Sequence, residues 1–267
     1  YNTEKALIQP VKYHRCKSEK DLLKQFIDFW SNQDNTPDVI TGWNIRFFDV
    51  PYIVNRTAKV LGLEYVRKFS PWGMVDYRQI ERRGKKSDSY DIRGIQQLDY
   101  LELFQKFGYS YGPQESYKLN HIAYVVLGDK KLSFEESGSL KNLYKDDFQK
   151  YIDYNMKDVE LIERFEEKMG LITLAMTIAY KGGVNYTDTF GTTAIWESII
   201  YRKLYSQKIA PPINSFVQNK KQFAGGYVKD PQVGMHDWVV SFDLNSLYPN
   251  IIVQWNMSTE TLIDQSE

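Results

Sequence analysis

The sequence predicts a mixed α/β fold in which helices pack on a sheet. Strand-like and helix-like segments follow one another along the chain of 267 residues, with neither an internal repeat nor a low-complexity stretch. Hydrophobic residues make up 42% and charged residues 25%, which is typical of a globular protein and excludes a disordered chain. The length accommodates one large domain or two smaller ones.

Capping residues and hydrophobic spacing predict the elements of the first half. Ser18, with Asp21 three residues later, forms a capping box at the start of an amphipathic helix. Pro51 near the start and Gly62 at the end delimit a second helix. The expected strands are 39–43, 74–80 and 89–95, the last two joined by a basic hairpin tip at 82–86, and the expected helices are 18–30, 49–62, 98–107 and 116–127.

Longer helical patterns dominate the second half. Gly182 and Gly183 end one helical region, and Pro211 follows the next. The expected elements are helices at 146–179 and 192–208, an apolar strand at 238–242 and a helix that starts near Ser246.

The charges balance, with 34 Lys and Arg against 34 Asp and Glu, but they are unevenly distributed. Residues 56–86 include nine basic and three acidic side chains, whereas 135–168 include ten acidic and six basic ones. The basic run suits contacts with phosphate, although a solvated surface is the simpler explanation of such a run taken alone. The zero sum therefore does not exclude a nucleic-acid partner.

Several functional classes lack their sequence signals. A single cysteine, Cys16, excludes a disulfide framework and a cysteine-rich zinc site. His14, His121 and His236 lack metal-ligand spacing, and no GxxxxGK[ST], GxGxxG or GxSxG string occurs. No apolar run reaches the roughly 20 residues of a membrane span, and no signal peptide is evident. Carboxylates remain as the reactive groups, and their oxygens suit Mg²⁺.

Three carboxylates stand at positions that suit metal ligands, and each has a simpler alternative. Asp49 lies where a strand and loop run into a helix, which is also the usual position of an N-cap. Asp158 follows Tyr154 by four residues, so both lie on one helix face, as they also would in an ordinary amphipathic helix. Asp243 ends the apolar strand before Ser246, a layout that suits Mg²⁺ beside a phosphate tail, with a capping Asp as the alternative.

These strings resemble motifs of the family B DNA polymerases, most closely of the T-even bacteriophage type, and they occur in the family's order. Phe223 stands where the family usually has Tyr. The resemblance covers nearly the whole chain. The matching strings are Asn44 to Asp49 for the second exonuclease motif, Tyr154 to Asp158 for the third, Phe223 to Gly226 for the segment that links exonuclease and palm, and Asp243 to Ile252 for motif A of the palm.

The resemblance implies an α/β chain made of a ribonuclease-H-like 3′–5′ exonuclease domain followed by the start of a family B polymerase palm. The implied bounds are 1–171 for the exonuclease domain, 172–214 for a returning segment of the N-terminal domain and 215–267 for the palm. The family's Asp-x-Glu motif does not precede Asn44, and its later palm motifs are also missing. We therefore expect a piece of a longer polymerase that shows neither activity, or only traces, by itself.

The resemblance also implies roles for individual residues. Tyr154 would position the water that attacks DNA, and Tyr248 would pack under the sugar and reject a 2′-hydroxyl. The implied catalytic residues are Asp49, Tyr154, Asp158 and Asp243; the implied metal ligands are Asp49, Asp158, Asp243 and the carbonyl of Leu244; the implied nucleotide-binding residues are Ser246, Leu247 and Tyr248; and the implied DNA-binding residues are Phe223, Gly225, Gly226, Arg82 and Arg83.

The implied cofactor is Mg²⁺ in two-metal sites, with Mn²⁺ as a substitute. The implied partners are primer-template DNA and deoxynucleoside triphosphates in the cytoplasm, which is the host cytoplasm if a phage encodes the chain. A sliding clamp and other replisome proteins would bind through regions outside this chain, and no membrane contact is expected. Two alternatives stay open: a stand-alone exonuclease, against which the Ser-Leu-Tyr-Pro string after Asp243 argues, and a non-catalytic DNA-binding part of a split polymerase.

Overall fold

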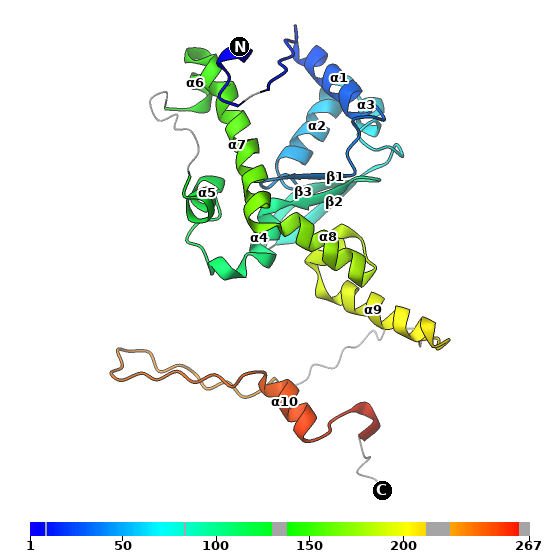
Figure 1. Ribbon diagram of the computed structural model, residues 1–267, viewed down its shortest axis with the longest axis vertical. Coiled ribbons are helices and arrows are strands. Elements are labelled where there is room, and N and C mark those ends of the chain that lie inside the picture. Colours follow the sequence, from blue (N-terminus) through cyan, green and yellow to red (C-terminus); the bar gives the residue numbers. More distant parts are fainter. Residues whose placement is uncertain (9, 83, 130–137, 212–224, 262–267) are drawn as a thin grey trace. The chain divides into compact units, whose positions relative to one another are not determined.

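The computed structural model describes residues 1–8, 10–82, 84–129, 138–211 and 225–261 (Figure 1). The chain divides into two compact units, an N-terminal unit, Tyr1–Pro212, and a C-terminal unit, Ile213–Glu267. Helices and strands both occur, as the sequence predicts. Within the described residues, no helix combines the length and apolar character that crossing a bilayer requires.

The N-terminal unit contains all the strands of the described residues and most of the helices. Its strands are β1 (Val39–Gly42), β2 (Val75–Arg82), β3 (Lys85–Ile92) and β4 (Gln96–Asp99). Its helices are α1 (Glu19–Trp30), α2 (Asp49–Leu61), α3 (Leu63–Arg67), α4 (Tyr100–Phe107), α5 (Leu119–Leu127), α6 (Leu140–Asp146), α7 (Phe148–Met169), α8 (Leu171–Gly182) and α9 (Thr192–Ser206), with the short 3₁₀ helices η1 (Thr3–Lys5), η2 (Tyr109–Tyr111) and η4 (Tyr186–Phe190). The C-terminal unit contains α10 (Leu247–Gln254) and η5 (Thr259–Thr261).

The strands form two pairs. β1 and β4 run parallel, with Gly42 opposite Asp99 at their carboxyl ends. β2 and β3 form an antiparallel hairpin in which Arg82 faces Lys85 beside the tip. Successive residues of β1 point to opposite faces, since Val39 packs against one buried cluster and Ile40 against the other. The parallel pair therefore has apolar packing on both faces.

Two hydrophobic clusters fix the helices to these strands. The first joins β4, α4, α5, α7 and α8 through side chains such as Leu98, Leu103 and Phe165. The second joins α1, α2, α3 and β3 through side chains such as Ile27 and Val54. Figure 1 shows α1, α2 and α3 grouped together and α7 running beside the strands. The helices that carry Asp49 and Asp158 are thus each attached to a buried core.

Several local predictions are confirmed. Ser18 is the N-cap of α1, and its hydroxyl accepts a hydrogen bond from the Asp21 N–H at 3.2 Å. Gly62 ends α2 with φ of 92°, a left-handed conformation that glycine adopts without steric cost. Gly183 ends α8 in the same way, with φ of 66°. The hairpin also forms, but Arg82 ends β2 and Lys85 and Lys86 begin β3, so part of the expected tip at 82–86 belongs to the strands.

Other expected bounds are wrong. Leu98 and Asp99 belong to β4, because they pair with β1, and so the expected helix at 98–107 begins two residues later. The helix expected from Ser116 begins at Leu119. The expected helix at 146–179 is interrupted at Gly170, whose left-handed φ of 61° separates α7 from α8.

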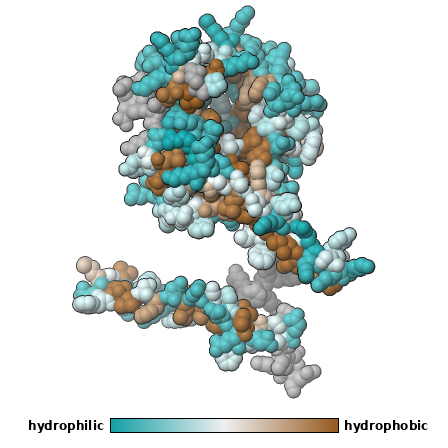
Figure 2. Space-filling model, in the orientation of Figure 1, coloured by the Kyte–Doolittle hydropathy of each residue, from teal (hydrophilic) through white to brown (hydrophobic). Residues whose placement is uncertain are grey.

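The C-terminal unit contradicts the strand expected at 238–242. No strand occurs among its described residues, 225–261. Trp238 has a φ of 57°, outside the range of an extended strand, and Trp238 and Phe242 are 97% and 90% exposed. The helix expected near Ser246 does form, as α10, but it buries none of its residues. Figure 2 shows apolar side chains, in brown, along the surface of this unit.

Candidate active site

Asp49 is the first residue of α2, and the N-cap position belongs to Phe48. The interpretation of Asp49 as an N-cap is therefore wrong. The Val50 N–H donates to the Ile45 carbonyl at 2.9 Å, and Val50 and Pro51 are buried, so the helix start is held rigidly. Asp49 is exposed as a residue, although neighbouring side chains partly shield its carboxyl group from water.

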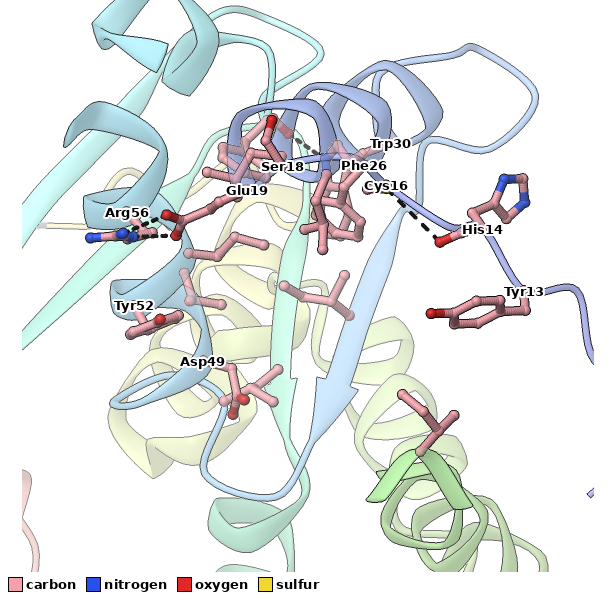
Figure 3. Close-up of a pocket in the computed structure, with 18 of the residues that line it drawn as sticks. Tyr13, His14, Cys16, Ser18, Glu19, Phe26, Trp30, Asp49, Tyr52 and Arg56 are labelled. Carbon is pink, nitrogen blue, oxygen red and sulfur yellow. Dashed lines mark hydrogen bonds and ion pairs between the residues drawn. The ribbon is translucent and has the colours of Figure 1, made fainter. Parts of the chain in front are cut away.

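Asp49 lies at a pocket of about 980 Å³ within the N-terminal unit. Figure 3 shows Asp49 at the start of α2, with Tyr52 and Arg56 further along that helix and Glu19 of α1 paired with Arg56. The surrounding side chains remove part of its hydration, and this burial raises the pKa of the Asp49 carboxyl, while its own backbone N–H opposes the rise. From α6 and α7 the pocket is lined by Tyr144, Phe148, Tyr151 and Ile152.

Tyr154 and Asp158 lie one turn apart on α7, and both are half-buried. One carboxylate oxygen of Asp158 is fully buried, so this side chain is not the exposed acid of an ordinary amphipathic helix. Asp158 does not line the pocket at Asp49. Among the described residues, no three His, Cys, Asp or Glu side chains come together as a metal site. Asp49 and Asp158 therefore form at most part of a ligand set.

The structure adds a carboxylate that the sequence reasoning missed. Asp99 is the last residue of β4 and the N-cap of α4, and it is fully buried. Its Oδ1 accepts hydrogen bonds from the N–H groups of Asn44 and Leu101, and its Oδ2 accepts one from Arg46, all at 3.0 Å. Burial raises the pKa of Asp99, and the hydrogen bonds from Arg46 and Asn44 oppose that rise. The Asp-x-x-Glu spacing of Asp99 and Glu102 is a helix-start signal, and it indicates Asp99 as the N-cap from the sequence.

In the C-terminal unit, Asp243 is exposed and precedes the start of α10 by a short turn. Ser246 is the N-cap residue, with a left-handed φ of 51°, and Leu247 and Tyr248 begin the helix. The side-chain amide of Asn250 donates to the Asn245 carbonyl at 2.9 Å and ties the turn to the helix. Asp243 is therefore not the N-cap, and the first N–H groups of α10 belong to Leu247 and Tyr248.

The glycines of the linking motif lie in the same unit. A Cβ atom at Gly226 would lie 3.5 Å from the Tyr248 hydroxyl, so this glycine passes beside the motif A tyrosine. Gly225 has open space where its Cβ would be. Phe223, like Arg83 in the other unit, lies outside the described residues.

Comparisons with known proteins bear on both units. A model of the DNA polymerase family B exonuclease domain matches residues 1–122, and a model of DNA polymerase family B matches residues 188–267. The chain is 34% identical over 260 residues to a DNA-directed DNA polymerase of Enterobacteria phage T4, covering 97% of this chain and 28% of that protein. It is 33% identical over 257 residues to a DNA-directed DNA polymerase of Escherichia phage RB69, covering 96% of this chain and 28% of that protein.

A cellular relative is also similar. The chain is 29% identical over 261 residues to a DNA polymerase delta catalytic subunit of Candida albicans, covering 93% of this chain and 24% of that protein. The chain thus spans about a quarter of the length of these relatives. The similarity runs through both units and is not confined to one motif.

Proposed function

Because this chain belongs to the DNA polymerase family B, we propose that it supplies part of the proofreading exonuclease and the beginning of the polymerase palm of a replicative DNA polymerase. The observation that carries this proposal is the order of the two family matches, exonuclease at 1–122 and polymerase at 188–267. The proposed domain bounds are 1–171, 172–214 and 215–267. A ribonuclease-H-like fold for the first domain is supported by the parallel pair of β1 and β4 with packing on both faces.

For the exonuclease we propose that Asp49 and Asp158 contribute metal ligands and that Tyr154 orients the attacking water. The rigid start of α2 would hold the Asp49 carboxylate in one orientation, and α7 would hold Tyr154 and Asp158 on one face. Mg²⁺, or Mn²⁺ in its place, would lower the pKa of a bound water and stabilise charge on the phosphate. Because the described residues do not complete a metal site, further carboxylates are needed.

For the polymerase we propose that Asp243 and the carbonyl of Leu244 contribute metal ligands. Ser246, Leu247 and Tyr248 would meet the triphosphate, because the first N–H groups of a helix favour phosphate oxygens. Tyr248 would also pack under the sugar and exclude a 2′-hydroxyl. The small distance between Gly226 and Tyr248 supports a common site for the two motifs.

We propose primer-template DNA and deoxynucleoside triphosphates as the substrates. Phe223, Gly225 and Gly226 would follow the template strand, and Arg82 and Arg83 would meet the primer end. A sliding clamp and other replisome proteins would bind elsewhere in the polymerase. Such an enzyme acts where the DNA replicates, which for a phage is the host cytoplasm.

Assays of DNA degradation and extension test the proposal. A polymerase that contains this chain should remove nucleotides from the 3′ end of single-stranded DNA and extend a primer, in both cases only with Mg²⁺ or Mn²⁺ present. The 267-residue chain by itself should show neither activity or only traces, because no three His, Cys, Asp or Glu side chains come together among its described residues. Asp49→Ala should remove the degradation and spare the extension. A polymerase that degrades DNA normally with Asp49→Ala would contradict the exonuclease assignment.

A further inference from the structure

We infer that Asp99 is a positioning residue that sets the loop between β1 and α2 and thereby orients Asp49. The link to catalysis rests on the proposed exonuclease function, but the link to the loop stands on the contacts alone. Asp99 ends β4, and in the parallel register it lies opposite Gly42, the last residue of β1. It therefore faces the point at which the chain leaves β1 and turns toward Asp49.

The carboxylate of Asp99 accepts three hydrogen bonds, and two of them come from this loop. The N–H groups of Asn44 and Arg46 both point at it, at 3.0 Å. The third bond, from the Leu101 N–H, belongs to its role as N-cap of α4. A capping role needs only that third bond, so the other two bonds fix the loop.

The loop that these bonds hold has an unfavourable start. Asn44 has a φ of 67°, in the left-handed region that residues other than glycine seldom adopt. From there the Phe48 N–H donates to the Asn44 carbonyl at 3.1 Å, and the Val50 N–H to the Ile45 carbonyl at 2.9 Å. These turns lead directly into Asp49. A shift at Asn44 would therefore propagate to the first turn of α2.

A second contact connects α4 to the same loop. The Arg46 guanidinium lies 3.1 Å from the Glu102 carboxylate, and the two side chains are 23% and 10% exposed. Glu102 thus holds the Arg46 side chain, whereas Asp99 holds the Arg46 backbone. Of these two contacts, the one with Asp99 acts on the backbone that continues to Asp49.

The substitution Asp99→Asn separates positioning from capping. Asn is as good an N-cap as Asp, so a purely capping Asp99 tolerates this change. The loop does not tolerate it, because an amide has one acceptor oxygen. If that oxygen keeps the capping bond from the Leu101 N–H, it also keeps the bond from the Asn44 N–H, and the NH₂ group then faces the Arg46 N–H. The side chain keeps its size, so the effect is confined to these hydrogen bonds.

Hydrogen exchange of the 267-residue chain tests the loop directly. We expect Asp99→Asn to speed exchange in residues 43–50 by about tenfold or more, while α4 and the core helices stay protected. Asp147→Asn is the matched control, since Asp147 is the N-cap of α7 and its side chain accepts a hydrogen bond from the Lys150 N–H. Glu102→Gln should change the loop less than Asp99→Asn does. Unchanged exchange in 43–50, or an equal increase throughout the N-terminal unit, would overturn the inference.

Exonuclease kinetics of a polymerase that contains this chain test the consequence for Asp49. We expect Asp99→Asn to lower kcat for 3′ nucleotide removal by about tenfold, to leave KM for DNA within about twofold and to raise the Mn²⁺ concentration needed for half the maximal rate. Ile122→Val, which shortens one buried side chain of α5, should leave all three unchanged. A normal kcat, or a change in KM alone, would contradict positioning. If Asp49→Ala keeps full activity, the proposed function fails instead, and hydrogen exchange still decides the role of Asp99.

Discussion

In the N-terminal unit, the helix that carries Tyr154 and Asp158 buries Leu161 and Phe165 completely, whereas in the C-terminal unit the helix that follows Asp243 buries no residue. Both helices bear motifs that resemble the same polymerase family. Their difference teaches that a motif and the packing that makes it rigid are separate properties of the chain. Local residue spacing specifies each helix, but a surrounding core is needed to fix the orientation of its functional side chains.

The loop that leads to Asp49 and the turn that follows Asp243 differ in the same way. The loop that leads to Asp49 is bound by the buried carboxylate of Asp99, which comes from a distant part of the sequence. The turn after Asp243 is tied locally, through the contact of Asn250 with the Asn245 carbonyl. We therefore expect Asp49 to keep one orientation in this chain and Asp243 to sample several.

Hydrogen exchange should give the largest difference between the units. Amides of Leu161 and Phe165 should exchange only on global unfolding, and those of Ile252 and Val253 in α10 by local opening. With a global stability of several kcal/mol, the rates should differ by at least about 10³-fold. Mass spectrometry of peptic peptides measures both regions in one sample. Comparable protection in α10 and α7 would remove the contrast.

Truncation of one apolar side chain in each unit should give the second largest difference, in the free energy of unfolding. Leu161→Ala, at a fully buried position, should lower the free energy of unfolding of the N-terminal unit by about 2–5 kcal/mol. Val253→Ala, at a position 80% exposed, should change the free energy of unfolding of the C-terminal unit by less than about 0.5 kcal/mol. Urea unfolding followed by tryptophan fluorescence measures both. A costly Val253→Ala would show that α10 is packed in solution.

Two glycines allow a smaller, backbone-level comparison. Gly170→Ala should cost about 1–2 kcal/mol, because φ is 61° there and the space around it is open, so the cost comes from the backbone alone. Gly226→Ala should leave the stability of the chain unchanged. Thermal unfolding of the two variants gives the answer, and equal effects would mean that the break between α7 and α8 is not held in this conformation.

Tyr1 should show the smallest effect, a shifted titration. Burial, together with the hydrogen bond that its hydroxyl donates to Asp153 of α7 at 2.9 Å, raises the pKa of Tyr1 to about 12. Because this pKa lies above the usual tyrosine value of 10.0, the contribution of Tyr1 to stability is complete below pH 10.0 and is lost as the pH rises through about 12. The tyrosinate absorbance of the chain minus that of Tyr1→Phe isolates this group. Titration of Tyr1 with the usual pKa of a tyrosine would show that the N-terminal segment does not stay on α7.

The sequence predicts what depends on neighbours along the chain. The start of α1 at Ser18 and the end of α2 at Gly62 follow from capping chemistry that acts within a few residues. Asp49, Tyr154 and Asp158 likewise stand on the predicted elements. These are local properties, so they can be predicted without knowledge of the tertiary structure.

What the sequence could not predict depends on tertiary contacts. Leu98 and Asp99 look helical by spacing, but pairing with β1 makes them a strand. The hydrogen bond that the Asn44 N–H donates to Asp99 joins residues 55 positions apart. The apolar run at 238–242 predicts a strand, yet no strand forms among the described residues of the C-terminal unit, because a strand needs a partner for its backbone.

The most direct test of the account is a pair of variants in a polymerase that contains this chain, Asp158→Ala and Asp243→Ala, each assayed for 3′ degradation and for primer extension. We assign the two aspartates to separate active sites. We therefore expect that Asp158→Ala removes degradation, raises the error rate and spares extension, and that Asp243→Ala removes extension and spares degradation. Equal loss of both activities in either variant would contradict this assignment.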